Sequence, residues 1–131
     1  MKQSLSYVQR LHRREDFESA LKVKPITEKW LAIHWEQNLT GKDRLGIVVS
    51  KRTIPQASKR NRIKRHIREL FRTSVYSKAS SLNVVVRLRR NVLTDEISEF
   101  RQAASRLLMK VRLTQNDSPN SIVNKGLSIS D

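Results

Sequence analysis

Residues 59–72 read KRNRIKRHIRELFR, and this stretch is the most informative part of the chain for both its fold and its partner. Its apolar residues recur at i, i+4, i+7 and i+8, which is the spacing of one face of an α-helix. They are Ile63, Ile67, Leu70 and Phe71. At about 100° per residue, the polar and basic side chains gather on the opposite side of the same helix. Those are Asn61, Lys64, Arg65, Arg68 and Arg72. The pattern predicts a helix that buries one face and presents a strongly cationic one.

The charge on this helix is one-sided, since Glu69 is the only acidic residue of the stretch. Like charges one helical turn apart destabilise an isolated helix by a few tenths of a kcal/mol per pair. The alternative interpretation is an ordinary solvated face, but such faces usually mix both signs of charge. The imbalance therefore favours a polyanion as the partner of this helix.

The whole chain shares this bias, with 27 Lys and Arg against 12 Asp and Glu, a net charge of +15 over 131 residues. Such a field recruits phosphate backbones, so nucleic acid is the leading partner and an anionic membrane surface the second. Without cysteine there are no disulfides or thiolate zinc sites. No run of about 18 apolar residues is present, and the first residues lack the apolar core of a signal peptide, so we expect a cytoplasmic protein.

Periodicity and turn residues predict a single two-layer α+β domain. The expected order is a helix over 15–22, strands over 30–35 and 45–50, the basic helix from Ser58, a strand over 83–88 and a helix from Thr94 to about 113. The first two strands are expected to form a hairpin through 36–43, with the β-branched strand 45–50 central and a short extra strand near 50–53. Residues 1–12 are expected to be a flexible basic segment, 13–113 the domain, and 114–131 a disordered polar tail.

In this architecture one face of the sheet is covered by helices and the other is partly open. An open face on a basic protein suits single-stranded nucleic acid, because each base stacked on an aromatic side chain contributes about 1–3 kcal/mol. The candidate aromatics are Phe17, Trp30 and Trp35, with burial in the core as the alternative for the two tryptophans. Strand alternation would put Trp30 and His34 on one face.

Residues 44–72, RLGIVVSKRTIPQASKRNRIKRHIRELFR, closely resemble the signature of the bacterial ribonuclease P protein subunit. That family shows a strand ending in Ser-Lys-Lys/Arg, a short loop, and an Arg-Asn-Arg-x-Lys-Arg helix. The stretches LHRREDF, WLAIHW and VVVRLRRN are similar to its first helix, first strand and last strand, so the resemblance covers roughly residues 7–113. It implies a left-handed βαβ crossover around the basic helix, against the usual preference.

The resemblance also implies a function in tRNA processing. In that family the ribonucleoprotein hydrolyses one phosphodiester bond to remove the 5′ leader of precursor tRNA. The RNA subunit supplies the catalytic groups and holds most of the Mg²⁺, so no catalytic residue, protein metal site or organic cofactor is expected here. The implied partners are the catalytic RNA and precursor tRNA, without a membrane or an obligate protein partner. A polycation between two RNAs would screen their repulsion and lower the Mg²⁺ requirement.

By similarity, one group of residues contacts the catalytic RNA, and the leader is assigned to Phe17, with Trp30 and His34 as weaker candidates. The RNA-binding group is Lys51, Arg52, Arg60, Asn61, Arg62, Lys64, Arg65, Arg68 and Arg72. Helix geometry refines this, because Arg60 lies close to the apolar stripe and is expected either to brace the fold or to line a cleft, while Arg62 is expected to interact with Glu69.

The chain departs from the family pattern at two places. Pro55 and Gln56 stand where the family often has Gly-Asn, and Leu21 stands where a second aromatic often follows Phe17. No catalytic constellation competes with this interpretation, because the three histidines have no metal-ligand spacing and three glycines form no phosphate loop. His66 is expected to pack or to face RNA. The alternatives are a ribosomal-type RNA-binding protein without a role in cleavage and, third, a nucleoid-type DNA binder.

Overall fold

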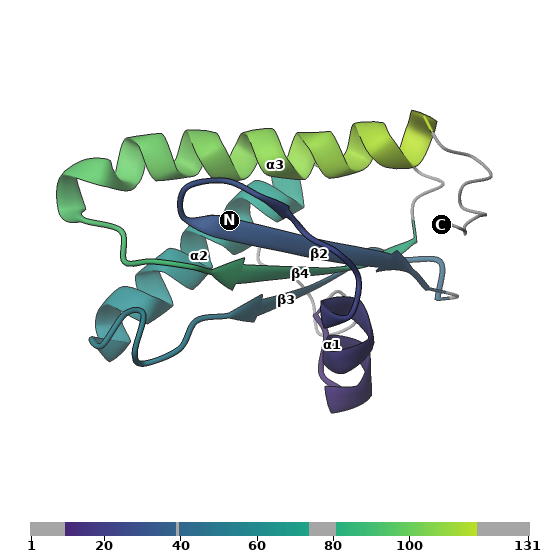
Figure 1. Ribbon diagram of the computed structural model, residues 1–131, viewed down its shortest axis with the longest axis horizontal. Coiled ribbons are helices and arrows are strands. Elements are labelled where there is room, and N and C mark those ends of the chain that lie inside the picture. The colour runs from purple at the N-terminus through teal and green to yellow at the C-terminus, as the bar shows by residue number, and fades with distance from the viewer. Residues whose placement is uncertain (1–9, 39, 74–80, 118–131) are drawn as a thin grey trace, which may run out of the picture.

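A four-stranded sheet with helices on both sides forms the protein, as the computed structural model shows (Figure 1). The structure describes residues 10–38, 40–73 and 81–117. The strands are β1 (Ile26–Thr27), β2 (Leu31–Gln37), β3 (Arg44–Val48) and β4 (Leu82–Leu88). The helices are α1 (Arg14–Leu21), α2 (Ala57–Thr73), the 3₁₀ turn η2 (Thr94–Glu96) and α3 (Ile97–Asp117). This α+β architecture confirms the predicted fold class.

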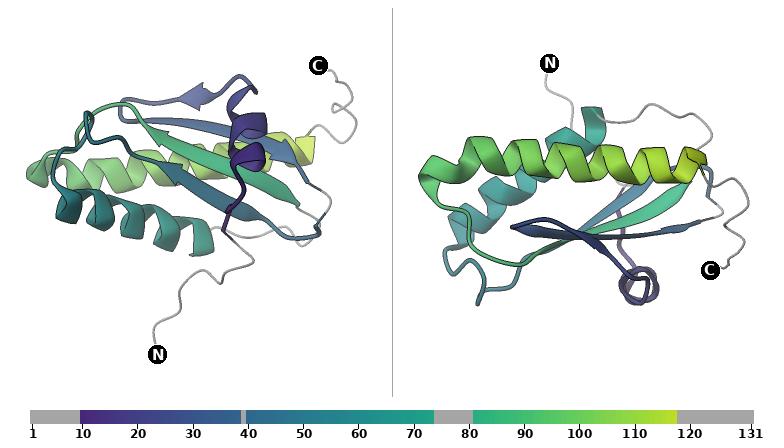
Figure 2. Two further views of the ribbon diagram at one scale, coloured as in Figure 1. Left: turned by 90° about the horizontal axis from the view of Figure 1, so that it is seen from below. Right: turned by 45° about the horizontal axis from the view of Figure 1, so that its top comes forward.

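The long helices α2 and α3 cover one face of the sheet, and α1 lies on the other (Figure 2). The larger core forms under α2 and α3, where the predicted apolar stripe of the basic helix is buried at Ile63, Ile67 and Phe71. A smaller cluster under α1 joins Leu11, Ala20 and Val85. The sheet therefore separates a thick apolar layer from a thin one.

The sheet order is β1-β2-β4-β3, with β4 antiparallel to β2 and parallel to β3. The connection from β3 to β4 runs through α2, which lies behind the sheet in Figure 1. Both strands point left in that view and β4 lies above β3, so the crossover is left-handed. This is the rare hand that the family resemblance implied.

The hairpin predicted between strands 30–35 and 45–50 is wrong. These strands are β2 and β3, and β4 lies between them in the sheet. The central position belongs to β4, whose run of valines is buried on both faces, whereas β3 is an edge strand. The extra strand near 50–53 is a turn, closed by a bond from the Ile54 N–H to the Ser50 carbonyl at 3.0 Å. The short strand of the sheet is instead β1.

Several predicted boundaries also shift. Residues 10–12 belong to the fold, since the Leu11 N–H donates to the Leu45 carbonyl at 2.9 Å and its side chain is buried, while 1–9 lie outside the described residues. Ser58 is inside α2 rather than its cap, and Thr94 opens η2 after Leu93. Helix α3 continues to Asp117, so the expected tail is helical over 114–117; its remainder lies outside the described residues.

Candidate nucleic-acid interface

A cleft of about 140 Å³ opens between α1, β3 and α2. Its walls come from segments far apart in the sequence, because α1 crosses the open face of the sheet while α2 follows the β3 edge (Figure 2). The lining residues are Arg10, Leu11, Phe17, Leu45, Gly46, Ile47, Lys64 and Arg68. One aromatic ring, an aliphatic floor and three cations thus meet in one hollow.

The Phe17 ring lies directly against the backbone of β3 at Gly46. A Cβ atom at Gly46 would lie 2.4 Å from Phe17 Cε1 and 2.6 Å from Cζ, closer than real Cβ contacts allow. The same atom would lie 3.1 Å from Leu11 Cδ1. Glycine leaves room for the ring here, and the half-buried Phe17 forms one wall of the cleft.

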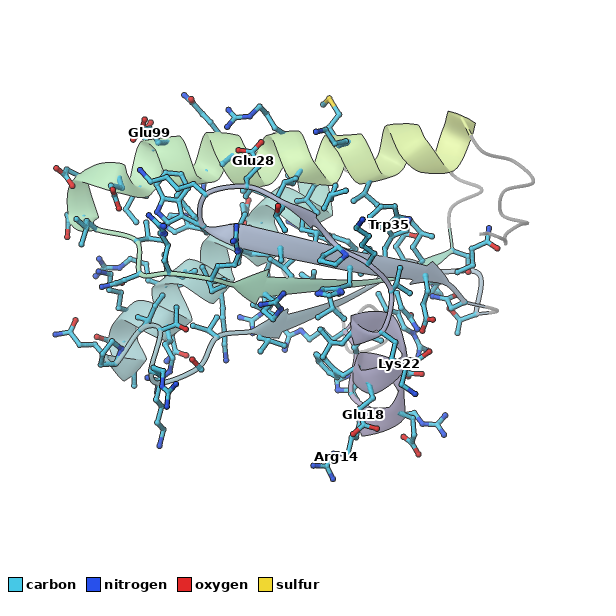
Figure 3. All side chains as sticks on the ribbon, in the orientation of Figure 1. Arg14, Glu18, Lys22, Glu28, Trp35 and Glu99 are labelled. Carbon is cyan, nitrogen blue, oxygen red and sulfur yellow. The ribbon has the colours of Figure 1, made fainter. Side chains whose placement is uncertain are left out.

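Three cations line the same cleft without an acidic residue among its walls. Lys64 and Arg68 stand one helical turn apart on α2, and Arg10 reaches the cleft from the segment before α1. Burial, followed by the charge of Arg10, lowers the pKa of Arg68, which nevertheless stays protonated at neutral pH. Glu18 on α1 pairs with Arg14 at 3.5 Å, at the outer end of that helix in Figure 3. The cleft therefore attracts anions.

A second set of polar groups points to solvent outside the cleft. Asn61, Arg62 and Arg65 are exposed on α2. The predicted outward face therefore divides into the exposed Asn61 and Arg65 and the cleft pair Lys64 and Arg68. Lys51 and Arg52 are exposed in the turn that follows β3. Four of these five exposed residues are cationic.

Arg60 and Arg72 donate hydrogen bonds to other groups of the protein. The Arg60 guanidinium donates to the carbonyl oxygens of Ile54 and Pro55, each at 2.9 Å, as expected for a residue beside the apolar stripe. Arg72 pairs with Glu69, so the expected interaction of Glu69 with Arg62 is wrong. Arg72 reaches Glu69 because the two residues are three apart on the helix.

Trp30 and His34 are corrected as leader candidates, because both side chains are buried. Trp30 is 3% exposed, and its ring packs edge-on against Phe100 with centroids 6.0 Å apart. It precedes the first residue of β2, so strand alternation does not govern its direction, and it joins the core under α3. His34 is 4% exposed beneath α1, where its Nδ1 lies 2.7 Å from the Val23 carbonyl oxygen.

Sequence reasoning missed Arg10 and Gly46 as parts of the cleft. Arg10 stands in a segment that shows no periodicity, and a bridge with Leu45 places it beside β3. Gly46 offered a signal, since a glycine inside a strand often marks a close approach of another group.

Within 10–38, 40–73 and 81–117, no three His, Asp or Glu side chains are placed to hold a metal ion. No helix in that part of the chain is long and apolar enough to cross a bilayer.

The fold and the cleft define a class: a basic α+β protein with a left-handed crossover and an aromatic, cation-lined groove. The chain belongs to the ribonuclease P protein family, whose model, described as Ribonuclease P, matches residues 5–112. It is similar to the ribonuclease P protein component of Nitrosomonas eutropha, with 33% identity over 104 residues that cover 77% of this chain and 85% of the relative.

Other relatives match over a shorter stretch. The ribonuclease P protein component of Halorhodospira halophila is 40% identical over 65 residues, which cover 48% of this chain and 53% of that relative. The chain thus spans about half the length of that relative. Among solved structures, the RNase P protein from Thermotoga maritima superposes with a TM-score of 0.58 at 26% identity, covering 78% of this chain and 93% of that one. These matches agree on family and fold.

Proposed function

We propose that this chain is the protein subunit of ribonuclease P, a ribonucleoprotein that removes the 5′ leader from precursor tRNA. The observation that carries the proposal is the contact of Phe17 with Gly46 inside a cleft whose charged walls are all cationic. Single-stranded nucleic acid binds to such sites by stacking a base on the ring while cations follow its backbone. The cleft would hold the leader.

The exposed set on α2 would bind the catalytic RNA. Asn61, Arg62 and Arg65 face away from the sheet, and a phosphate backbone along α2 could also reach Lys51 and Arg52. An exposed cationic surface suits a duplex or folded RNA, which is contacted mainly through its phosphates because its bases are already stacked and paired. Lys64 and Arg68 would then lie between the two RNAs, with the leader in the cleft and the catalytic RNA on the exposed side of α2.

The protein's contribution to cleavage would be electrostatic and positional. Each phosphate neutralised by a Lys or Arg releases a condensed counterion, so protein cations replace part of the Mg²⁺ that otherwise screens two RNAs. Catalytic groups and Mg²⁺ would belong to the RNA. The residues of the cleft would fix the leader, and through it the position of the scissile bond.

The test is cleavage of a precursor tRNA by a bacterial ribonuclease P RNA at low Mg²⁺, with and without this protein. The expected result is restored cleavage at the mature 5′ end. Phe17→Ala should lower the affinity for a long-leader substrate by about 1–3 kcal/mol and leave a one-nucleotide leader unaffected. Lys22→Gln, an exposed change at the end of α1, is the matched control.

Salt dependence separates the two surfaces. Arg65→Ala should reduce the salt slope of binding to the catalytic RNA by about one counterion, while Arg68→Ala should act on leader affinity because Arg68 lines the cleft. A protein that binds RNA yet leaves cleavage unchanged would support the ribosomal-type alternative. Preference for DNA over RNA at equal salt would support the nucleoid-type one.

A further inference from the structure

Helices α2 and α3 meet at a hydrogen bond between an arginine, which is always cationic, and a histidine, which becomes cationic when it takes up a proton. Arg101 of α3 places a guanidinium nitrogen 2.7 Å from Nδ1 of His66 on α2. Arginine can only donate, so Nδ1 is the acceptor. His66 is therefore neutral in this arrangement, with its proton on Nε2.

This contact lies on the far side of α2 from the cleft. His66 is two residues after Lys64 and two before Arg68, which places it about 200° around the helix from each. Both His66 and Arg101 are only partly buried, so solvent reaches the pair. A ligand in the cleft could not contact it.

The charges around His66 are predominantly positive. Burial, then the charges of Arg101, Arg62 and Arg65, lower the pKa of His66. Glu69, one turn further along α2, is hydrogen-bonded to Arg72. Glu99 projects from the outer side of α3 in Figure 3. Across the described segments, no carboxylate pairs with the three guanidinium groups around His66.

We propose that Arg101 and His66, together with Arg62 and Arg65, form a phosphate-binding site at the α2–α3 contact, and that it takes a backbone phosphate of the catalytic RNA. The inference rests on the proposed function for its RNA partner. Arg101 contacts His66 directly, and the charges of Arg62 and Arg65 act on the same ring. Guanidinium groups without a carboxylate partner suit the several oxygens of a phosphodiester, to which arginine donates in paired geometry. The site extends the exposed face of α2 onto α3.

Phosphate binding at this site is linked to a proton. A phosphate oxygen replaces Nδ1 as the acceptor for Arg101, and His66 takes up a proton from solvent to donate to the phosphate. The bound phosphate thus raises the pKa of His66 above its lowered value in the free protein. The complex then binds more protons than the free protein between the two pKa values of His66. RNA affinity therefore rises as the pH falls from the higher of these pKa values to the lower.

Binding to a bacterial ribonuclease P RNA between pH 8 and pH 5.5, at constant ionic strength, tests the site. Arg101→Gln should weaken binding about 5–10-fold, as expected for a lost phosphate contact. Lys110→Gln, an exposed change on the same helix with the same loss of charge, should change it by about twofold at most. His66→Gln keeps an acceptor for Arg101, so it should match the parent at pH 8 and lose the rise toward pH 5.5.

Two results would overturn the site: equal affinities of Arg101→Gln and Lys110→Gln, or an unchanged pH profile in His66→Gln. Urea unfolding of each variant confirms that the fold is intact. A readout without RNA separates this inference from the proposed function: NMR titration of His66 in inorganic phosphate or in chloride at equal ionic strength. Phosphate should raise the His66 pKa in the parent and not in Arg101→Gln, and an equal pKa in both salts contradicts the site.

Discussion

The two faces of the sheet differ in what lies on them, although the same strand supplies both. Val84 and Val86 of β4 point into the thick core under α2 and α3, while Val85 between them joins the thin cluster under α1. The helix-covered face is closed and apolar, whereas the α1 face leaves a cleft beside its cluster. Neighbouring residues of β4 thus serve different faces: Val84 and Val86 stabilise the larger core, and Val85 supports the face that carries the cleft.

The largest expected effect on stability is on the face that α2 and α3 cover. Phe100 of α3 is fully buried and packs against Trp30. Phe100→Ala should lower the free energy of unfolding by about 3–5 kcal/mol, because it removes a large apolar side chain and leaves a cavity. Urea denaturation measures this, and RNA binding by the folded fraction should stay unchanged. A loss below about 1 kcal/mol would contradict the closed core described here.

Gly46→Ala tests the packing on the α1 face of the sheet. The new Cβ would lie 2.4 Å from Phe17 Cε1, so the ring must leave its place. We expect a stability loss of about 1–3 kcal/mol together with weaker leader binding. In a Phe17→Ala background the stability cost should largely disappear, which a double-mutant cycle by urea denaturation detects. Additive effects would mean that the ring does not depend on Gly46.

Arg60 and Arg65 allow the same contrast within one helix. Arg60→Gln loses two hydrogen bonds to the loop carbonyls before α2 and should lower stability by about 1–2 kcal/mol. Arg65→Gln, on the exposed side, should change stability by no more than about 0.5 kcal/mol. Thermal unfolding and binding to the catalytic RNA should rank the two variants in opposite order. The same ranking in both assays would refute this division of roles.

The smallest effect concerns the start of α3. The Leu93 N–H donates to the Glu96 carboxylate at 2.9 Å, and this bond is the main reason that the pKa of Glu96 is lowered. A carboxyl with a lowered pKa in the folded state adds stability above its unfolded pKa and loses it as pH falls through the folded value. Glu96→Gln should therefore lower the urea midpoint slightly at pH 7 and match the parent near pH 2. If the urea midpoints of variant and parent differed by the same amount at both pH values, the charge of Glu96 would not be the cause of the difference.

Local features of the sequence predicted the helices well, because their causes are local. The spacing of Ile63, Ile67 and Phe71 fixes which face of α2 is buried, and the same geometry indicated that Arg60 braces the loop before it. Phe17 came from the family resemblance, and the structure places it in the cleft. The buried face of α2 and the place of Arg60 depend on residues a few positions apart, whereas Phe17 was found by resemblance alone.

Strand pairing and the cleft could not be predicted in the same way. The sequence around β2 and β3 contains no signal that β4, which follows α2 in the chain, lies between them in the sheet. The alternation that grouped Trp30 with His34 failed because the strand begins one residue after Trp30. Arg10 and Gly46 meet Phe17 only once the sheet has formed, so their role depends on tertiary contacts.

The central position of β4 sets an order of events during protein synthesis. Strand β3 pairs with β4 in the sheet, and β2 pairs with β1 and β4, so neither can complete its pairing until Leu88 has left the ribosome. The basic helix is made before that strand, and its apolar stripe then lacks the sheet on which it packs. A nascent chain of this protein therefore carries an exposed cationic segment beside ribosomal RNA until its last strand is inserted.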